Sequence, residues 1–358
     1  MIKEDKIKIL VVSHKPFRIP EGECFVPIHA GRAVALTKSK DGTIDNNDLN
    51  WLLKNTIGDD TGDNISDKNR FYSECTAIYW AWKNYDKLGN PDYIGLMHYR
   101  RHFIFNEEYY KNKEKDFVEQ IYKVSFENYI TQNYIDKIGL TYDCIREVCK
   151  KYDIIVSKDT SLEMYGDVNL RKDYTQYIEG TKAKDFDLMV ETVLKMYPSY
   201  ENSLKKHING SAKLSFNMFV MKKELFFEYC EFLFNILFYM EKQIDFSTYS
   251  TNGKRTLGYI AEILLTIFVW KLEEDSSRKI LKLGITKIDY PYSAEQVKKL
   301  VPENRPHFTS YLFNKLKYLT AQNKLRKERL KQKYKAIRDS RKEYKKIKRI
   351  YKILSKEN

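Results

Sequence analysis

The chain has 358 residues, of which 42% are hydrophobic and 14% aromatic, so its composition is that of a folded protein and excludes a disordered one. Its five cysteines are odd in number and include no CxxC pair, which argues against a disulfide framework and against a zinc site. The net charge is +14, and residues 315–358 carry this whole excess with 18 basic and 4 acidic residues, while the rest of the chain holds 45 of each sign.

Short β-branched runs alternate with apolar helical segments over most of the chain. We expect buried strands near residues 7–12, 92–97, 153–156, 216–221 and 283–288, and helices near residues 72–84, 223–239 and 258–272. The order strand, loop, helix, strand indicates an α/β fold, and ligands of such sheets bind where the strands end. The pattern predicts a single catalytic domain over residues 1–306.

Residues 307–358 have a different pattern. From Phe308 onward neither Gly nor Pro interrupts a predicted helix of about 45 residues with one apolar face and basic surroundings. Two interpretations stay open, a coiled coil that joins copies of the chain and a helix that lies on an anionic membrane. Nucleic-acid binding is disfavoured because the body of the chain is neutral.

The expected location follows from two absences and from this tail. No N-terminal stretch resembles a signal peptide, and no apolar run approaches the ~18 residues of a membrane-spanning helix. We therefore expect a cytoplasmic protein, peripheral on the inner face of the cell membrane through its basic tail.

The densest polar segment covers residues 59–69, between the first strand and the first helix. Its short side chains suit ribose hydroxyls, a uracil edge or a metal, and the alternative is a solvated turn that caps a helix. No DxD pair follows the strand at Met97, and the nearest acidic substitutes are Asp59, Asp60 and Asp63. We assign no metal ligand, and assistance by Mn²⁺ or Mg²⁺ stays open.

A run of cationic and aromatic residues, His98, Tyr99, Arg100, Arg101 and His102, directly follows an apolar strand. Fixed cations at a strand end can stabilise the negative charge of a departing nucleotide diphosphate without a metal. The alternative is a strand end with surface salt bridges. Neighbours on a strand alternate faces, so both arginines cannot point into one site if the strand continues.

One carboxylate, Glu262, interrupts an apolar helical stretch. A carboxylate there must be paired, hydrogen-bonded or functional. It can serve as the general base that takes the proton of an acceptor hydroxyl, or it can pair with Arg255. Both interpretations stay open.

Five phrases in order along the chain together resemble a known family. They are VPIHAG at 26–31, DTGDNIS at 60–66, YWAWKN at 79–84, YIGLMHYRR at 93–101 and NMFVM at 217–221. The family they resemble consists of bacterial capsular and exopolysaccharide biosynthesis glycosyltransferases, long catalogued as a domain of unknown function, with some members linked to galactofuranosyl transfer. The resemblance runs from about residue 8 to residue 288.

The resemblance implies a GT-A-like (Rossmann-like) nucleotide-binding sheet, a UDP-linked sugar donor and a lipid-linked oligosaccharide acceptor of surface polysaccharide synthesis. We expect substrate-binding residues just after the strands and in the polar segment, namely His14, His29, Gly31, Asp63, Asn64, Ser66, Asn69 and Tyr99. His98 with Arg100 or Arg101 would face the diphosphate, and Asn217, Arg255 and Glu262 would lie toward the acceptor.

The chain departs from the family's pattern near residue 177, where a His is common in the family. Asp185 or Asp187 could therefore supply the base instead of Glu262, and Glu262 and Asp187 are the leading candidates for the base of an inverting transfer. A function of another class is also open, a non-catalytic, membrane-associated scaffold of a polysaccharide assembly complex that associates through the tail.

Overall fold

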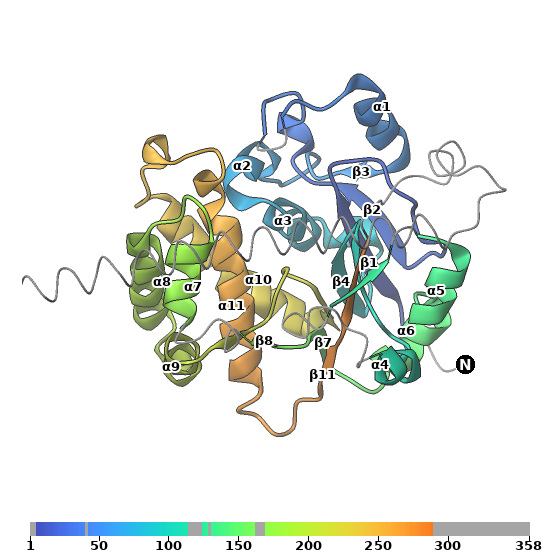
Figure 1. Cartoon of the computed structure of the whole chain (residues 1–358). Helices are drawn as coiled ribbons and strands as arrows, with labels where there is room; N and C mark the ends of the chain where they lie inside the picture. The colour runs from blue at the N-terminus through green and yellow to red at the C-terminus, as the bar shows by residue number, and fades with distance from the viewer. Residues whose placement is uncertain (1–4, 40–41, 114–123, 128–129, 162–168, 289–358) are drawn as a thin grey trace, which may run out of the picture. The chain divides into compact units, whose positions relative to one another are not determined.

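A mixed β-sheet forms the centre of the protein in a computed structural model that describes residues 5–39, 42–113, 124–127, 130–161 and 169–288. The main path of the sheet runs β11-β7-β10-β4-β1-β2-β3 (Figure 1). In chain order these strands are β1 (Ile7–Ser13), β2 (Phe25–His29), β3 (Ile57–Gly58), β4 (Tyr93–His98), β7 (Ile154–Ser157), β10 (Phe219–Lys222) and β11 (Ile280–Leu283).

Most neighbouring strands are parallel. β1 lies parallel to β2 and β4, β3 parallel to β2, and β11 parallel to β7, whereas β10 runs antiparallel to both β4 and β7. In β1 every residue except Lys8 is buried, as expected of a central strand covered on both faces. These observations confirm the predicted α/β fold with a sheet between helices.

Two smaller groups of strands flank this path. β5 (Arg101–Phe103) pairs with β4 and with β12 (Ile285–Ile288), and β12 pairs with β6 (Val124–Glu127). β8 (Thr160–Ser161) and β9 (Ala212–Lys213) form a separate antiparallel pair.

Helices cover both faces of the sheet (Figure 1). One face carries α3 (Cys75–Lys83), α10 (Lys223–Glu241) and α11 (Thr256–Leu272), and the other carries α5 (Gln132–Ile138) and α6 (Tyr142–Cys149). The other helices are α1 (Asn46–Asn55), α2 (Asn69–Tyr72), α4 (Glu107–Lys113), α7 (Leu170–Tyr177), α8 (Ala183–Met196) and α9 (Glu201–Asn209). No helix in the described ranges is both long and apolar enough to cross a membrane.

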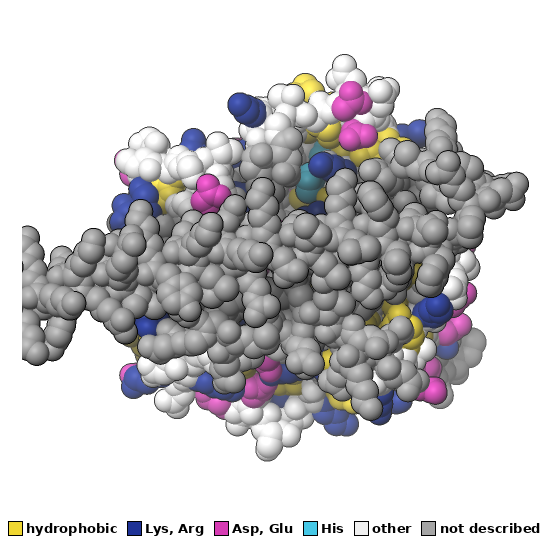
Figure 2. All heavy atoms as spheres, in the orientation of Figure 1, with side chains coloured by type: hydrophobic (Ala, Val, Ile, Leu, Met, Phe, Trp, Pro, Cys, Tyr) yellow, Lys and Arg dark blue, Asp and Glu magenta, His cyan; other side chains and the backbone are white. Residues whose placement is uncertain are grey.

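Charged side chains of both signs are spread over the described surface of the face in Figure 2. This distribution agrees with the equal numbers of basic and acidic residues before residue 315. The predicted basic tail and the predicted domain boundary at residue 306 lie outside the described residues, all of which belong to one compact unit, Met1–Val297.

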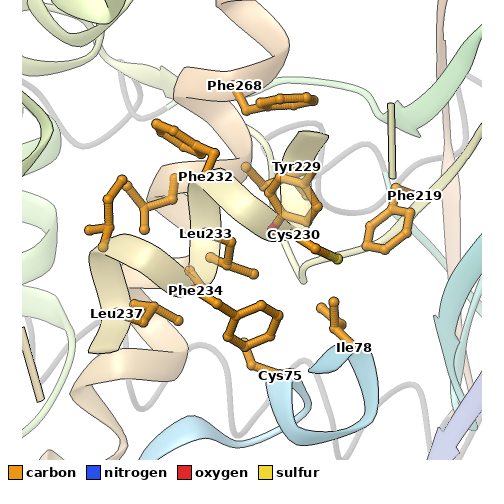
Figure 3. Close-up of a cluster of buried hydrophobic side chains, with 14 of the residues drawn as sticks. Cys75, Ile78, Phe219, Tyr229, Cys230, Phe232, Leu233, Phe234, Leu237 and Phe268 are labelled. Atoms are coloured by element: carbon orange, nitrogen blue, oxygen red, sulfur yellow. The ribbon is translucent and has the colours of Figure 1, made fainter. Parts of the chain in front are cut away.

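Aromatic side chains of α10 and α11 form a buried cluster in the core (Figure 3). The ring of Tyr229 lies 5.2 Å from that of Phe268 and 5.7 Å from that of Phe219, between centroids. Phe232 is 2% exposed and stacks on Tyr200 at 4.5 Å. Because aromatic burial dominates core energetics, this cluster holds both helices against β10.

The predicted elements differ from the structure mainly at their ends. β10 begins at Phe219, three residues later than expected, because Phe216 and Asn217 have positive φ and cannot continue a strand. The last predicted strand is two strands, β11 and β12, separated at Gly284. The predicted helix 72–84 is shortened to α3, after a break at Ser73.

Truncating Phe232 to alanine should lower the free energy of unfolding by about 3–5 kcal/mol, because the change leaves a cavity among packed rings. Phe227→Ala on the same helix is the matched control, since that side chain is 36% exposed, and it should cost clearly less. Urea unfolding followed by circular dichroism measures both. Equal losses would contradict the described packing of α10.

Candidate functional site

Four parallel strands end beside one another and position most of the predicted site residues. The register pairs His29 with Ser13 and with Gly58, and it pairs Val12 with His98. β10 runs antiparallel beside β4, so its beginning lies at the same edge. The side chains that follow β1 to β4 and precede β10 therefore converge at one edge of the sheet, the usual ligand position in α/β folds.

Asp59 follows β3 and organises the first half of this edge. Its buried carboxylate accepts the backbone N–H of Gly31 at 2.7 Å, that of Arg32 at 3.1 Å, and the hydroxyl of Ser66. Burial raises the pKa of Asp59, and these hydrogen bonds oppose the rise. Gly31 has a φ of +72°, and a Cβ there would lie 2.3 Å from Cγ of Asn69, so the position requires glycine.

The predicted nucleotide-binding residues of the polar segment form hydrogen bonds within the protein, mostly to nearby residues of the same region. Asn69 donates from Nδ2 to the carbonyl of Ser73 at 2.8 Å, and Asn64 accepts the N–H of Ser66 at 3.1 Å. Asp63 accepts a tyrosine hydroxyl from α3 at 3.2 Å and stays exposed. These contacts indicate that Ser66 and Asn69 hold the conformation of the loop, while Asp63 is accessible to a ligand.

Buried nitrogen atoms gather around His29 at the end of β2. Its Nδ1 is buried without a partner among the described residues, as are the Nε atoms of Arg32 and Arg70. The pKa of His29 is lowered to about 4, first by burial and then by the charges of Arg32, His14 and Arg70. The neutral imidazole thus lies among cations that attract an anion. Sequence reasoning missed both arginines, because each is an isolated basic residue outside any motif.

The turn between β4 and β5 separates the two predicted arginines. Arg101 pairs with His98 across the strands and lies over the ring of Phe216, 4.4 Å from its centroid. Its Nε is buried with no partner in the described ranges, and burial lowers the pKa of its guanidinium. Arg100 lies over Tyr99 instead, at 5.8 Å. The two cations have different surroundings because the strand does not continue: Arg100 lies in the turn, and Arg101 begins β5.

Two histidines near the arginines belong to different surroundings. His14 packs edge-on against the buried ring of Tyr99, with centroids 5.4 Å apart. His102 is buried, and its Nδ1 lies 2.7 Å from the hydroxyl of Tyr134 in α5. His14 and Tyr99 therefore belong to the candidate site, and His102 belongs to the core beneath α5.

His98 is a neutral member of the cationic run. Its Nε2 donates to the carbonyl of Phe216 at 2.7 Å. Burial is the main cause that lowers the pKa of His98 to about 4, with Arg101 and Arg100 lowering it and Glu74 opposing them. The imidazole carries no charge at neutral pH, so the positive charge predicted for this cluster resides on the arginines.

Phe216 and Asn217 form a strained turn in front of β10. Their φ values are +75° and +49°, a region that costs a non-glycine residue about 1–2 kcal/mol. Asn217 is buried and donates from Nδ2 to Oε1 of Glu74 at 2.8 Å and to the carbonyl of Gly258 at 3.3 Å. Strain of this kind concentrates at functional sites.

Two carboxylates face this turn from different helices. Glu262 in α11 accepts the N–H of Phe216, and burial raises its pKa, with Lys213 lowering it and Glu74 raising it further. Glu74 precedes α3 and was not among the predicted site residues. An acidic residue at a helix start has an ordinary structural explanation, so the sequence offered no reason to select it.

Arg255 does not form the alternative pair proposed for Glu262. Its Nε donates to Oγ of Ser73 at 3.1 Å and its Nη1 to the hydroxyl of Tyr259 at 3.1 Å. Among the described residues no ion pair joins Arg255 to Glu262, because Arg255 precedes α11 and its side chain points to Ser73, just after α2. That alternative is wrong, and Arg255 supports the helix start instead.

Asp187, the other predicted base, lies on α8, beyond α11 from the strands (Figure 1). Its two carboxylate oxygens accept hydrogen bonds from Arg171 at 2.8 and 2.7 Å. Arg171 lowers the pKa of Asp187, which makes this carboxylate a weaker proton acceptor.

Neither a metal cluster nor the larger cavity adds residues to this site. Within the described ranges no group of three or more His, Cys, Asp or Glu residues could hold a metal ion. A cavity of about 660 Å³ lies toward the amino end of β1, where Lys6, Lys8 and Lys87 line it with Trp80. None of the predicted site residues lines that cavity.

Comparison with known proteins gives one family and one solved structure for this chain. No curated protein matches it. The structure described as the WbbM bifunctional glycosyltransferase apo structure matches with a TM-score of 0.67 and 33% sequence identity over 80% of this chain. The match covers 46% of the WbbM chain, so the present chain spans less than half of the length of that protein.

The family model described as a domain of unknown function, DUF4422, matches residues 8–274, which is most of the chain and almost the whole described region. The match covers the strand ends, the polar segment, the arginine run and both carboxylates of the site. It confirms, at the level of the family, the resemblance that the five phrases indicated. The chain therefore belongs to the DUF4422 family.

Proposed function

We propose that this protein is a glycosyltransferase that moves a hexose from a nucleotide diphosphate donor to a hydroxyl of a glycan acceptor. The observation that carries the proposal is the turn at Phe216, which Arg101 and Glu262 both contact. A cation for a leaving diphosphate and a carboxylate for a proton thus meet at one edge of a GT-A-like sheet. The similarity to WbbM supports the same reaction class.

The proposed chemistry is a direct displacement that inverts the anomeric centre. The bond between the anomeric carbon and the diphosphate oxygen breaks while the acceptor oxygen forms a new bond to that carbon. Negative charge grows on the departing diphosphate, and Arg100 and Arg101 stabilise it. The proton of the acceptor hydroxyl moves to the carboxylate of Glu262.

Glu262 suits the base role better than Asp187. Burial raises the pKa of Glu262, so its carboxylate holds a proton more strongly than an exposed one. Asp187 is committed to Arg171, and its pKa is lowered. We therefore assign the base to Glu262.

The finer parts of the proposal concern substrates and location. We propose a UDP-linked donor, with galactofuranose or another hexose, and a lipid-linked oligosaccharide acceptor of capsular or exopolysaccharide synthesis. The basic residues after position 314 would hold the enzyme at the anionic inner face of the cell membrane and near such an acceptor. Assistance by Mn²⁺ or Mg²⁺ is left to the binding experiment, because one or two carboxylates together with the phosphates of the donor can bind such an ion.

Donor binding is the first test. UDP and a panel of UDP-hexoses that includes UDP-galactofuranose, each with and without Mn²⁺ or Mg²⁺, should bind in titration calorimetry and raise the melting temperature. A donor at 100 times its Kd stabilises the folded protein by about 2.7 kcal/mol. If no nucleotide or nucleotide sugar bound under any condition, the scaffold interpretation would replace the enzyme.

Removing both arginines tests the diphosphate role. Arg100→Ala with Arg101→Ala should lower turnover by roughly 10²–10³-fold, because the charge on the leaving group loses its stabilising donors. The control Arg171→Ala removes an exposed arginine from an ion pair with Asp187 and should leave turnover unchanged. Thermal melts establish that both variants fold. Wild-type turnover in the folded double variant would refute this role.

Replacing each candidate base separates the two carboxylates. Glu262→Gln should lower kcat by roughly 10²–10⁴-fold, whereas Asp187→Asn should leave it near the wild-type value. The raised pKa of Glu262 also predicts that wild-type activity falls as pH drops through a midpoint above the ordinary value of 4.5, since the base must be ionised. The opposite ranking of the two variants would move the base to Asp187.

A further inference from the structure

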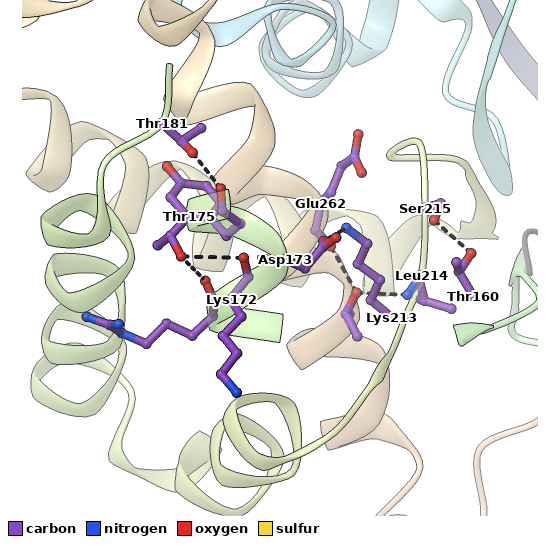
Figure 4. Close-up of polar contacts among 12 residues, drawn as sticks. Thr160, Lys172, Asp173, Thr175, Thr181, Lys213, Leu214, Ser215 and Glu262 are labelled. Carbon is purple, nitrogen blue, oxygen red and sulfur yellow. Dashed lines mark hydrogen bonds and ion pairs between the residues drawn. The ribbon is translucent and has the colours of Figure 1, made fainter. Parts of the chain in front are cut away.

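An ion pair that the proposed reaction does not use lies behind Glu262 (Figure 4). Nζ of Lys213 in β9 lies 2.5 Å from Oδ2 of Asp173 in α7. The two side chains are only 16% and 13% exposed, the most enclosed ion pair among the described residues. Enclosed charges act strongly on their neighbours because little water screens them.

Lys213 is the cation that acts most strongly on Glu262. Burial opposes ionisation of Glu262, and the charge of Lys213 is the largest influence that favours it. The ammonium group of Lys213 donates a hydrogen bond to Asp173, and both residues line the same small cavity as Glu262. Other titratable or polar groups around Glu262 come from β5, the start of α3, the Phe216 turn, α7, α9, α10 and α11: Arg101, Glu74, Cys75, the Phe216 N–H, Tyr174, His207, Tyr229 and Tyr259.

A small cavity joins these groups. It has room for about one water molecule, about 10 Å³, and Glu262, Lys213, Asp173 and His207 line it. His207 is fully buried, stacks on Phe186 at 6.3 Å, and has no partner for either ring nitrogen among the described residues. Four polar side chains thus meet at a space that Glu262 shares with the ion pair.

We propose that Lys213 and Asp173 are positioning residues that set how readily Glu262 ionises, with Lys213 favouring the carboxylate and Asp173 limiting that effect by binding Lys213. The inference rests on the proposed role of Glu262 as the base. Among the described residues no hydrogen bond or ion pair joins Lys213 or Asp173 to Arg100 or Arg101, so the pair would adjust the base without contacting the cations proposed for the diphosphate.

The two members of the pair should shift the pH profile in opposite directions. The acidic limb of the pH profile is the range in which kcat falls as the pH is lowered. In Lys213→Met the midpoint of this limb should move up by about one pH unit, because the Glu262 carboxylate loses a stabilising cation. At a pH below the wild-type midpoint this shift appears as a roughly tenfold loss of rate. In Asp173→Asn the limb should move down, because Lys213 then acts on Glu262 alone. Lys213→Arg keeps the charge and should keep the wild-type profile.

A matched control separates charge from structure. Lys282 forms a comparable, partly buried ion pair with Asp159 at 2.8 Å, away from Glu262. Lys282→Met should lower stability without moving the limb. A loss of kcat at every pH in Lys213→Met and Asp173→Asn, with no movement of either limb, would make the pair merely structural and overturn the inference.

A second readout does not need turnover. In protein labelled with ¹³C at the glutamate carboxyl, the Glu262 signal is assigned by its absence in Glu262→Gln, and its titration midpoint is measured in each variant. Opposite midpoint shifts in Lys213→Met and Asp173→Asn support the inference even if no donor yields transfer, which would count against the proposed function alone. Unchanged midpoints overturn the inference while a transferring wild type leaves the function standing.

Discussion

The hydrogen bond from Asn217 to Glu74 is the contact on which the candidate site depends. It is 2.8 Å long and joins residues 143 positions apart in the sequence. Asn217 also donates to the carbonyl of Gly258 in α11, so one amide connects the start of α3, the start of β10 and a helix from later in the chain. The amide group holds its own backbone at a positive φ that the chain would otherwise avoid. With that turn in place, the Phe216 carbonyl faces His98 and its N–H faces Glu262.

The antiparallel direction of β10 places this contact at the candidate site. β10 lies between β4 and β7, and its direction brings its beginning to the edge where the parallel strands end. A parallel strand in the same place would bring its opposite end there. Cations from the β4–β5 turn and a carboxylate from α11 can therefore meet around one peptide group. Burial then acts on both, since it lowers the pKa of Arg101 and raises that of Glu262.

The sequence predicted the sheet better than the site. Strands such as β1 and β4 are runs of apolar residues, and burial on both faces makes such runs visible without tertiary information. The cationic cluster at residues 98–102 could also be recognised in the sequence. The different surroundings of Arg100 and Arg101 could not, because Arg101 contacts Phe216, about 115 residues later in the chain. Glu74 escaped notice because only the fold brings it to Asn217. The possible pair of Arg255 with Glu262 is wrong because Arg255 donates instead to Ser73, a contact that helical spacing cannot reveal.

The contacts of the Asn217 turn join residues far apart in the sequence, which has a consequence for synthesis of the chain. During synthesis the ribosome releases β1, β2 and β4 well before residues 216–262 appear, so the early chain holds the arginines without their opposing carboxylate. Contacts between residues so distant in sequence form late, after loop closure has been achieved. The partly made chain is thus chemically incomplete. The candidate centre is complete only when α11, which carries Glu262, has been made and lies beside the sheet.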